Sequence, residues 1–372
     1  MKIVHVITKC DYGGAQTVVR ELALEQQRRG NQVFVITGQL GPVATQLSSA
    51  GISVVVEPHL IHAIAPGQDR LAVQGLRTTL KALDPDLVHT HSSKGGLVGR
   101  LAASRLGVAA VYTAHGWPFQ RGAPVSQRIM SFAGEWAAAR TDAHVVCVAS
   151  SERRLAQRLR IVPEKRLHLV GNGIGHRDES PRPPAAKPAH LELVMVARLA
   201  SPKRQDVLID ALRELPDVGV TFVGDGSNRE RLVDRARSIE DRVRFVGYAD
   251  ADAYLASSHA AVLLSDYEGL PLSVIEAMRH GLPVITNRLP GVADAIKHCR
   301  NGLTCELSAT SVAAAVDVLR DDGVRSHMGA AARDDWRAHF TAEAMADGYD
   351  GVYRAVRSSK PKPERRSPTA AR

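Results

Sequence analysis

Residues 2–37 read KIVHVITKCDYGGAQTVVRELALEQQRRGNQVFVIT. A short apolar run comes first, followed by a turn with the paired glycines Gly13 and Gly14, an amphipathic stretch over 15–29 and a second apolar run over 32–37. This order predicts a strand, a helix and another strand. Two strands joined by a crossover helix lie parallel in one sheet, so the segment predicts the start of a parallel α/β sheet.

The same alternation continues along the chain. In the first half, further strands are expected at 52–57, 86–91, 109–114, 144–148 and 166–170, with helices at 71–83, 96–106 and 127–140. A second series has expected strands at 191–196, 218–223, 242–246, 260–264 and 283–286, and helices at 205–212, 228–238, 271–279, 311–319 and 342–356. The pattern predicts an α/β fold with two doubly wound, Rossmann-like domains.

A proline-rich segment without periodicity separates the two series; its prolines are Pro181, Pro183, Pro184 and Pro188. We therefore expect a first domain over 1–175, a linker over 176–190 and a second domain over 191–340. A basic tail over 357–372 is expected to be disordered. Doubly wound sheets bind ligands at the carboxyl ends of their strands, which predicts a site in the cleft between the domains.

The charge balance argues against a nucleic-acid partner. Lys and Arg number 48 and Asp and Glu 39, which gives a net charge of +9. The tail over 357–372 holds six basic residues and one acidic residue, so it carries +5 of this charge. The remaining body is only mildly basic, and aromatic residues make up 4% of the chain. A concentrated basic face with interleaved aromatics, which nucleic-acid binding favours, is therefore not expected.

The cysteines and the hydropathy pattern favour a cytoplasmic protein. The four cysteines are scattered and form no Cys-x-x-Cys pair: Cys10, Cys147, Cys299 and Cys305. This usage suits a reducing compartment. The sequence shows no apolar run long enough to span a bilayer, and it enters the first strand without a signal-peptide pattern. The expectation is a protein that is soluble or peripheral to a membrane.

Residues 268–276 read EGLPLSVIE, so Glu268 and Glu276 bracket the start of a helix. Gly269 allows close approach of a ligand to the backbone, and Pro271 suits the first helical position. The free N–H groups of the first turn attract an anion, and the two acids can accept hydrogen bonds from sugar hydroxyls. The alternative is an acid favoured by the helix dipole together with a solvated glutamate.

Histidines and glycines follow strands of the first domain. Gly13 and Gly14 lack the Gly-x-Gly-x-x-Gly spacing, so they predict a tight turn or a close approach of ligand to backbone. His115 follows a strand directly, and His89 and His91 end the preceding strand on one face. These three histidines suggest a zinc site, but a polar lining of the cleft is the favoured interpretation, with His115 as its functional member.

In the second domain, Arg198 and Lys203 follow the first strand and can neutralise a diphosphate without a metal. The alternative is a pair of surface bases near a helix start. Gly224 lies in a Gly-Asp-Gly turn that can approach a nucleotide, and Tyr248 can flank its base; a turn and a packing role are the alternatives.

Two Asp-x-Asp triplets raise the question of a metal-dependent transferase, which holds its ion with such a pair. Asp84 and Asp86 stand in a turn that feeds a strand, whereas Asp250 and Asp252 suit the start of a helix. We interpret both triplets as structural. No metal and no other cofactor is expected.

Taken together, these motifs resemble the family 4 retaining glycosyltransferases of the two-domain GT-B architecture, and the resemblance spans residues 1–356. It depends on Gly13-Gly14, His115 in Ala-His-Gly, Asn172-Gly173, Arg198 and Lys203, Gly224-Asp225-Gly226, and the pair Glu268 and Glu276. One departure is Ala197, which stands before Arg198 where glycine is common. The resemblance also implies that the final helix, 342–356, packs back on the first domain.

The resemblance implies a role for each of these residues. Arg198 and Lys203 would hold the donor diphosphate, and Glu268 would hold the hydroxyls of the transferred sugar together with the amides of Gly269 and Leu270. In the same way, Glu276 would bind the ribose, His115 would lie beside the reacting sugar, and Gly14 would leave room for the donor phosphate and the acceptor.

The segments 89–96 and 114–119 are similar to those of bacterial transferases that build capsular, exopolysaccharide or lipid-linked glycans. The resemblance therefore implies a UDP- or GDP-sugar donor and a glycan or undecaprenyl-linked acceptor at the inner face of the membrane. The basic tail would favour peripheral contact with an anionic bilayer. Two alternatives stay open: a UDP-N-acetyl-sugar epimerase of the same architecture and a non-catalytic subunit that binds sugar nucleotides.

Overall fold

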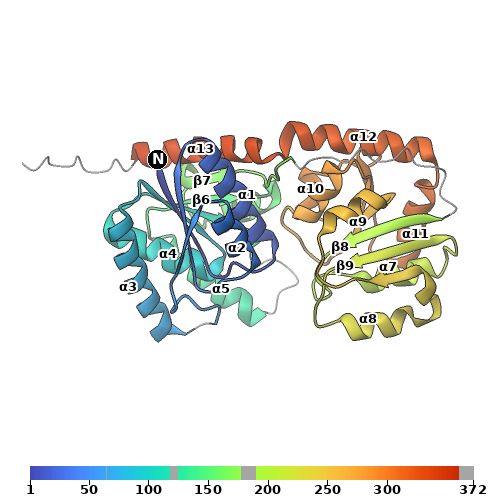
Figure 1. Ribbon diagram of the computed structural model, residues 1–372, viewed down its shortest axis with the longest axis horizontal. Helices are drawn as coiled ribbons and strands as arrows, with labels where there is room; N and C mark the ends of the chain where they lie inside the picture. The colour runs from blue at the N-terminus through green and yellow to red at the C-terminus, as the bar shows by residue number, and fades with distance from the viewer. Residues whose placement is uncertain (64, 118–124, 177–189, 360–372) are drawn as a thin grey trace, which may run out of the picture.

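Two separate parallel sheets organise the chain, seen here in a computed structural model that describes residues 1–63, 65–117, 125–176 and 190–359. The first sheet has the strand order β3-β2-β1-β4-β5-β6-β7, and the second has the order β10-β9-β8-β11-β12-β13 (Figure 1). Each adjacent pair of strands is parallel. The predicted fold class, two doubly wound α/β domains, is confirmed.

The first sheet is built from seven short strands: β1 (Lys2–Ile7), β2 (Gln32–Thr37), β3 (Ser53–Val56), β4 (Leu87–His91), β5 (Ala110–Ala114), β6 (His144–Cys147) and β7 (Leu167–Leu169). The helices between them are α1 (Gly14–Arg28), α2 (Pro42–Ser49), α3 (Pro66–Leu83), α4 (Ser93–Leu106), α5 (Val125–Ala138) and α6 (Ser150–Arg158), followed by the 3-10 turn Glu164–Arg166. β4 and β5 are buried along their whole length, as expected for central strands covered on both faces.

The second sheet contains β8 (Leu191–Val196), β9 (Val218–Val223), β10 (Val243–Phe245), β11 (Ala260–Leu263), β12 (Val284–Asn287) and β13 (Gly302–Cys305). Its helices are α7 (Gln205–Leu212), α8 (Arg229–Ala236), α9 (Ala251–Ser257), α10 (Leu272–Arg279), α11 (Ala309–Val318) and α12 (Asp322–His339), with 3-10 turns at Arg237–Arg242 and Val292–Asp294. Strand order reverses between β1 and β4 in one sheet and between β8 and β11 in the other. These two reversals are where a doubly wound fold places its ligands.

Several predicted boundaries were wrong. β13 and α12 were not predicted: β13 is only four residues long, and α12 buries a sparse stripe of Met328, Ala332 and Trp336. α3 begins at Pro66, five residues before the predicted start, because proline fits the first turn of a helix. The linker over 177–189, the segment 118–124 and the tail over 360–372 lie outside the described residues, while the last helix, α13 (Ala342–Ser359), includes Arg357.

α13 carries the chain from the second domain back onto the first, and Figure 1 shows it lying along the first domain above α1. Arg29, the residue after α1, forms ion pairs with Asp347 and Asp350 of α13, at 2.7 and 2.9 Å. In the part of the chain that the structure describes, no helix combines the length and the hydrophobicity of a membrane span.

The two chain segments that connect the domains run side by side. Ile174 and Thr341 form an isolated parallel bridge, in which the Ile174 amide donates to the Phe340 carbonyl and the Ala342 amide donates to the Ile174 carbonyl, each at 3.0 Å. Gly173 lies against this bridge, and a Cβ at this position would lie 2.1 Å from the Thr341 carbonyl oxygen. The crossing therefore requires glycine at 173.

We expect Gly173→Ala to lower the free energy of unfolding by about 1–3 kcal/mol, because the added methyl must displace backbone. Gly351→Ala is the matched control: a Cβ there meets nothing within 4 Å, and α13 should gain helix propensity. Urea unfolding of both variants tests this expectation. Equal midpoints for Gly173→Ala and the unmodified protein would contradict it.

Candidate functional site

The turn after β11 carries Glu268 and is held firmly by its neighbours. The side chain of Asn287 at the end of β12 accepts from the Ser265 amide at 3.0 Å and donates to the Ser265 carbonyl at 2.9 Å. A Cβ at Gly291 would lie 2.0 Å from the Gly269 carbonyl oxygen, so the next loop can pack here only as glycine. The Glu268–Gly269 backbone is thus fixed from two strands of the sheet.

Lys203 and Glu268, predicted from separate motifs, form an ion pair. The loop after β8 brings the lysine there, since the Arg204 amide donates to the Leu264 carbonyl at 2.9 Å and the Asp266 amide donates to the Pro202 carbonyl at 3.0 Å. The two side chains are 14% and 13% exposed. The pair is therefore shielded from water yet still reachable by a ligand.

Arg198 occupies the other end of the same loop. Its carbonyl accepts from the buried Gln205 side chain at 2.8 Å, and its side chain is exposed. Within the described residues, no hydrogen bond or ion pair joins the Arg198 guanidinium to Lys203 or Glu268. The guanidinium is thus open to solvent at the edge of the second sheet.

The turn that contains Gly224 packs beneath the Arg198 loop. Gly224 has a φ of +136°, and a Cβ there would lie 2.2 Å from the Ala197 carbonyl oxygen. The Gly224 amide donates to the Gly247 carbonyl at 2.8 Å. Tyr248 follows Gly247 directly in the chain, and it is 63% exposed. Gly224 thus has a structural role, and Tyr248 presents an open aromatic face at the same edge.

The helix start next to Glu268 differs slightly from the prediction. α10 begins at Leu272, and Pro271 is the N-cap with extended backbone, not the first helical residue. The N-cap carries no side-chain hydrogen bond, and the Val274 amide donates to the Pro271 carbonyl at 3.2 Å, which leaves the amides of Leu272 and Ser273 available to a ligand. Glu276 is half-buried in the second turn, and the Leu270 carbonyl accepts from Asn172 Nδ2 at 2.7 Å.

Glu152, which the sequence analysis missed, joins the two domains at this point. It is 1% exposed, and its Oε1 lies 2.8 Å from where a Cβ of Gly269 would stand and 3.8 Å from that of Gly116. The His115–Gly116 loop and the Glu268–Gly269 turn therefore both border one carboxylate. The available signal was its position shortly after the predicted strand 144–148, where ligand-binding residues collect.

Gly13 and Gly14 are exposed at the start of α1. A Cβ at Gly13 would lie 2.6 Å from the Gln16 side chain, whereas a Cβ at Gly14 would meet nothing within 4 Å. Gly14 therefore leaves open space at the carboxyl end of β1. Among the residues that the structure describes, no hydrogen bond joins this turn to the second domain.

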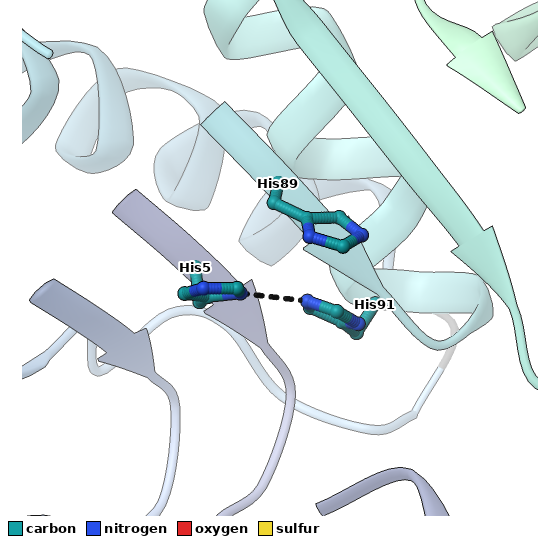
Figure 2. A group of neighbouring side chains, drawn as sticks. All are labelled: His5, His89 and His91. Carbon is teal, nitrogen blue, oxygen red and sulfur yellow. Dashed lines mark hydrogen bonds between the residues drawn. The ribbon is translucent and has the colours of Figure 1, made fainter. Parts of the chain in front are cut away.

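His115 belongs to a buried histidine cluster that also contains His5, His89 and His91. The His115 ring is bonded through Nε2 to Nδ1 of His91 at 3.0 Å, and Nε2 of His91 is bonded to Nδ1 of His5 at 3.0 Å. Figure 2 shows His5 on one strand facing His89 and His91 on the next. His5 was not among the predicted residues, because an inward position on a central strand normally holds an apolar side chain.

Burial keeps this cluster uncharged. Desolvation lowers the pKa of His5 and of His115 to about 4 and the pKa of His89 and His91 well below the ordinary value. Nearby histidines lower the pKa of His89 and His91 further, since a second positive ring would be repelled. At neutral pH all four rings are therefore neutral.

Three of these histidines, His5, His89 and His91, have ligand atoms within 4.8 Å of one another. Each of their six ring nitrogens, however, already has a hydrogen-bond partner. A tetrahedral zinc ion with bonds of about 2.0 Å needs ligand atoms roughly 3.3 Å apart. An ion would have to break these hydrogen bonds, so the geometry favours a polar network over a metal centre.

Both Asp-x-Asp triplets have structural roles, as predicted. Asp84 is the left-handed C-cap of α3, and Asp86 accepts from the Lys2 amide at 2.8 Å. Asp250 is the N-cap of α9, and Asp252 forms ion pairs with Arg279 and His280. The carboxylates of Asp86, Asp250 and Asp252 are thus bonded to backbone amides or to cationic side chains.

A fold of two doubly wound domains, with a lysine, two acids and an open helix start at the edge of the second sheet, defines the class of GT-B transferases. The family described as Glycosyltransferase Family 4 matches residues 12–177, and that described as Glycosyl transferases group 1 matches residues 176–335. Together these matches span most of the chain, which belongs to these families and is a glycosyltransferase.

Curated relatives and solved structures agree with this assignment. The chain is 26% identical to the O-antigen biosynthesis glycosyltransferase WbnH of Escherichia coli, covering 85% of this chain and 89% of the relative. It is also 26% identical to the E. coli UDP-Gal:alpha-D-GlcNAc-diphosphoundecaprenol alpha-1,3-galactosyltransferase, covering 83% and 84%. The structure of Anabaena HepE with UDP and glucose superposes with a TM-score of 0.80 at 20% identity, covering 95% and 99%.

The predicted family and the predicted enzyme class are thus confirmed. The two alternatives, an epimerase and a non-catalytic subunit, are not favoured, because these relatives are named as transferases. The roles of the individual site residues stay predictions.

The neutral histidines predict an acid-sensitive fold. Between pH 6.5 and about 4 the unfolded chain binds protons that native His5 and His115 do not, so stability rises with pH across this window and falls on acidification. Each histidine contributes a slope of at most about 1.4 kcal/mol per pH unit. His5→Gln should flatten the pH dependence of the unfolding free energy.

His62→Gln provides the control, because His62 is exposed and lies outside the buried histidine cluster. Urea unfolding at pH 5 and pH 7 measures the slopes. If the unfolding free energy of His5→Gln depends on pH as steeply as that of the unmodified protein, native His5 gains its proton over the same pH range as the unfolded chain.

Proposed function

We propose that this enzyme moves a sugar from a UDP- or GDP-sugar to a hydroxyl of a glycan or lipid-linked acceptor, with retention of anomeric configuration. The relatives support a role in bacterial cell-surface polysaccharide synthesis: two are named for O-antigen biosynthesis, and another for transfer to a diphosphoundecaprenol-linked sugar. Among the structural neighbours, HepE is in complex with UDP and glucose, which supports a UDP-sugar as the donor.

The observation that carries the proposal is the Lys203–Glu268 ion pair beside the open start of α10. A donor offers both groups a better partner. Its diphosphate draws the ammonium group of Lys203, together with Arg198 and the first-turn amides, while its sugar hydroxyls donate to the Glu268 carboxylate. Without a donor, each charge neutralises the other, so neither stands unpaired in a shielded site.

Charge stabilisation drives the reaction. As the bond between the anomeric carbon and the diphosphate oxygen breaks, negative charge grows on the nucleotide, where Lys203 and Arg198 hold it. The acceptor hydroxyl attacks from the same face, and its proton passes to the departing phosphate oxygen. The new glycosidic bond then has the configuration of the donor, and the products are the glycosylated acceptor and the nucleoside diphosphate.

The donor occupies the second domain in this proposal, and the acceptor enters from the first. Gly14 borders open space for the acceptor, and the half-buried His115 lies beside the transferred sugar. We expect two loops of the first domain, 59–69 and 117–124, to select the acceptor. Residues 66–69 form the start of α3, and the segment after the buried Trp117 lies outside the described residues. We place the enzyme in the cytoplasm, in peripheral contact with the inner membrane face.

Lys203→Ala and Glu268→Ala should each lower kcat/KM by about 100-fold or more, as expected when a group that stabilises developing charge is lost. The control is Arg204→Ala. Arg204 is the next residue along the chain, but its guanidinium is bound to Asp206 and Asp266. Transfer from a radiolabelled nucleotide sugar, with circular dichroism to verify folding, measures the effect. Near-normal turnover in a folded Lys203→Ala variant would refute the assignment.

Transfer should continue unchanged in excess EDTA, because protein cations and helix amides hold the diphosphate. Initial rates with and without the chelator, and after addition of Mg²⁺ or Mn²⁺, measure this. A rate that collapses in EDTA and recovers with either ion would assign ion binding to a carboxylate pair and overturn the metal-free mechanism.

A further inference from the structure

One continuous chain of hydrogen bonds connects His115 to the final helix. From His115 it passes through His91 and His5 to the side chain of Gln26 on α1, where Nε2 of His5 lies 2.8 Å from Gln26 Oε1. The Gln26 amide nitrogen then donates to the Tyr353 hydroxyl of α13 at 2.9 Å. The chain thus starts at the reaction site and ends on the helix that returns from the second domain.

Beyond Tyr353 the chain continues into the same core. The Tyr353 hydroxyl lies 2.7 Å from Nδ1 of His89, Nε2 of His89 lies 2.7 Å from the Thr113 hydroxyl, and that hydroxyl lies 2.8 Å from the Tyr349 hydroxyl. All of these side chains are at most 1% exposed, apart from the half-buried His115. Water therefore has little access to replace a missing partner.

The Gln26 amide gives the chain its direction. Its oxygen can only accept, so His5 must carry its proton on Nε2 and accept on Nδ1. His91 then donates from Nε2 to His5, and His115 donates from Nε2 to His91. Because neutral imidazole has one N–H, each ring in this series is the Nε2–H tautomer.

The Tyr353 hydroxyl holds the amide in this orientation. It accepts from the Gln26 nitrogen, which leaves its own proton for Nδ1 of His89, 2.7 Å away. A rotated amide would reverse every bond of the chain and place the proton of His115 on Nδ1. Without the hydroxyl, the Gln26 nitrogen loses its acceptor, and the two orientations approach each other in energy.

We propose that Gln26 and Tyr353 are positioning residues that fix His115 as the Nε2–H tautomer, with Nδ1 as a hydrogen-bond acceptor for the substrate. Nδ1 of His115 has no partner among the residues that the structure describes. The proposal rests on the proposed function, in which the substrate partner of Nδ1 is a hydroxyl of the transferred sugar or of the acceptor.

This arrangement gives His115 one chemical role. A neutral ring whose proton is committed to His91 can orient a hydroxyl by accepting from it, but it has no proton to give to the departing phosphate. The reversed tautomer would instead present an N–H donor to that hydroxyl. The C-terminal helix α13 thus determines whether His115 presents a hydrogen-bond acceptor or an N–H donor at Nδ1 to the substrate.

The test is a long-range ¹H–¹⁵N spectrum of the full-length protein labelled at histidine, at pH 7 without substrate. We expect the Nε2–H tautomer for His5, His91 and His115. An Nδ1–H tautomer or a charged ring at His115 overturns the proposal. This readout requires no transferase activity, so it stands even if the proposed function fails.

Two tyrosine variants of one helix give a matched comparison. Tyr353→Phe should populate the Nδ1–H form of His115, whereas Tyr349→Phe, which removes a hydroxyl beyond Thr113, should not. If Tyr353→Phe does not fold, Gln26→Leu removes the directing amide and should give the same mixed tautomers. A folded Tyr353→Phe or Gln26→Leu variant with the tautomer unchanged refutes the proposal.

In transfer assays, Tyr353→Phe should lower kcat in proportion to the fraction of His115 that leaves the Nε2–H form, which is about twofold when the two tautomers are equally populated. KM for the donor should change little, and Tyr349→Phe should keep the kcat of the unmodified enzyme. A normal kcat despite mixed tautomers would refute the positioning role, while absence of transfer by the unmodified enzyme would refute the proposed function alone.

Discussion

The reversal of strand order within each sheet is the constraint on which the rest of this molecule depends. At β1 and β4, adjacent strands run outward to helices on opposite faces, and the same holds at β8 and β11. Side chains that follow or end these strands therefore meet. Lys203 and Glu268 meet in this way at the second reversal. At the first reversal the contact lies within the sheet, where His5 inside β1 is bonded to His91 at the end of the neighbouring β4.

The polar side chains at the two reversals differ in charge. The second domain keeps full charges and pairs them, which leaves a cation ready to exchange its partner for a phosphate. The first domain removes charge by burial, and the lowered pKa of its histidines keeps them neutral. In the proposed function, neutral histidines would not compete for the diphosphate. The division suits an enzyme in which one domain binds the anion and the other presents the hydroxyl that attacks.

Features that follow from a local sequence pattern could be predicted from the sequence. Features that depend on contacts between residues far apart in the chain could not. Lys203 and Glu268 could be expected at one edge of the sheet because both follow predicted strands, and they form an ion pair there. Gln26 was missed because a glutamine inside an amphipathic helix normally indicates a solvated position, whereas here the residue is buried and bonded to His5 and to Tyr353 of α13. Likewise, no local signal shows that Gly173 lies against Thr341, since that contact joins residues far apart in the chain.

The contacts of α13 place the histidine chain on one side of the boundary between the domains. Its ion pairs with Arg29 and the hydroxyl of Tyr353 within the histidine chain tie the helix to the first domain. The chain leaves the first domain and returns to it at the paired crossings of Ile174 and Thr341. Because every member of the histidine chain belongs to the first domain or to α13, the bonds that set the tautomer of His115 do not pass through the second domain.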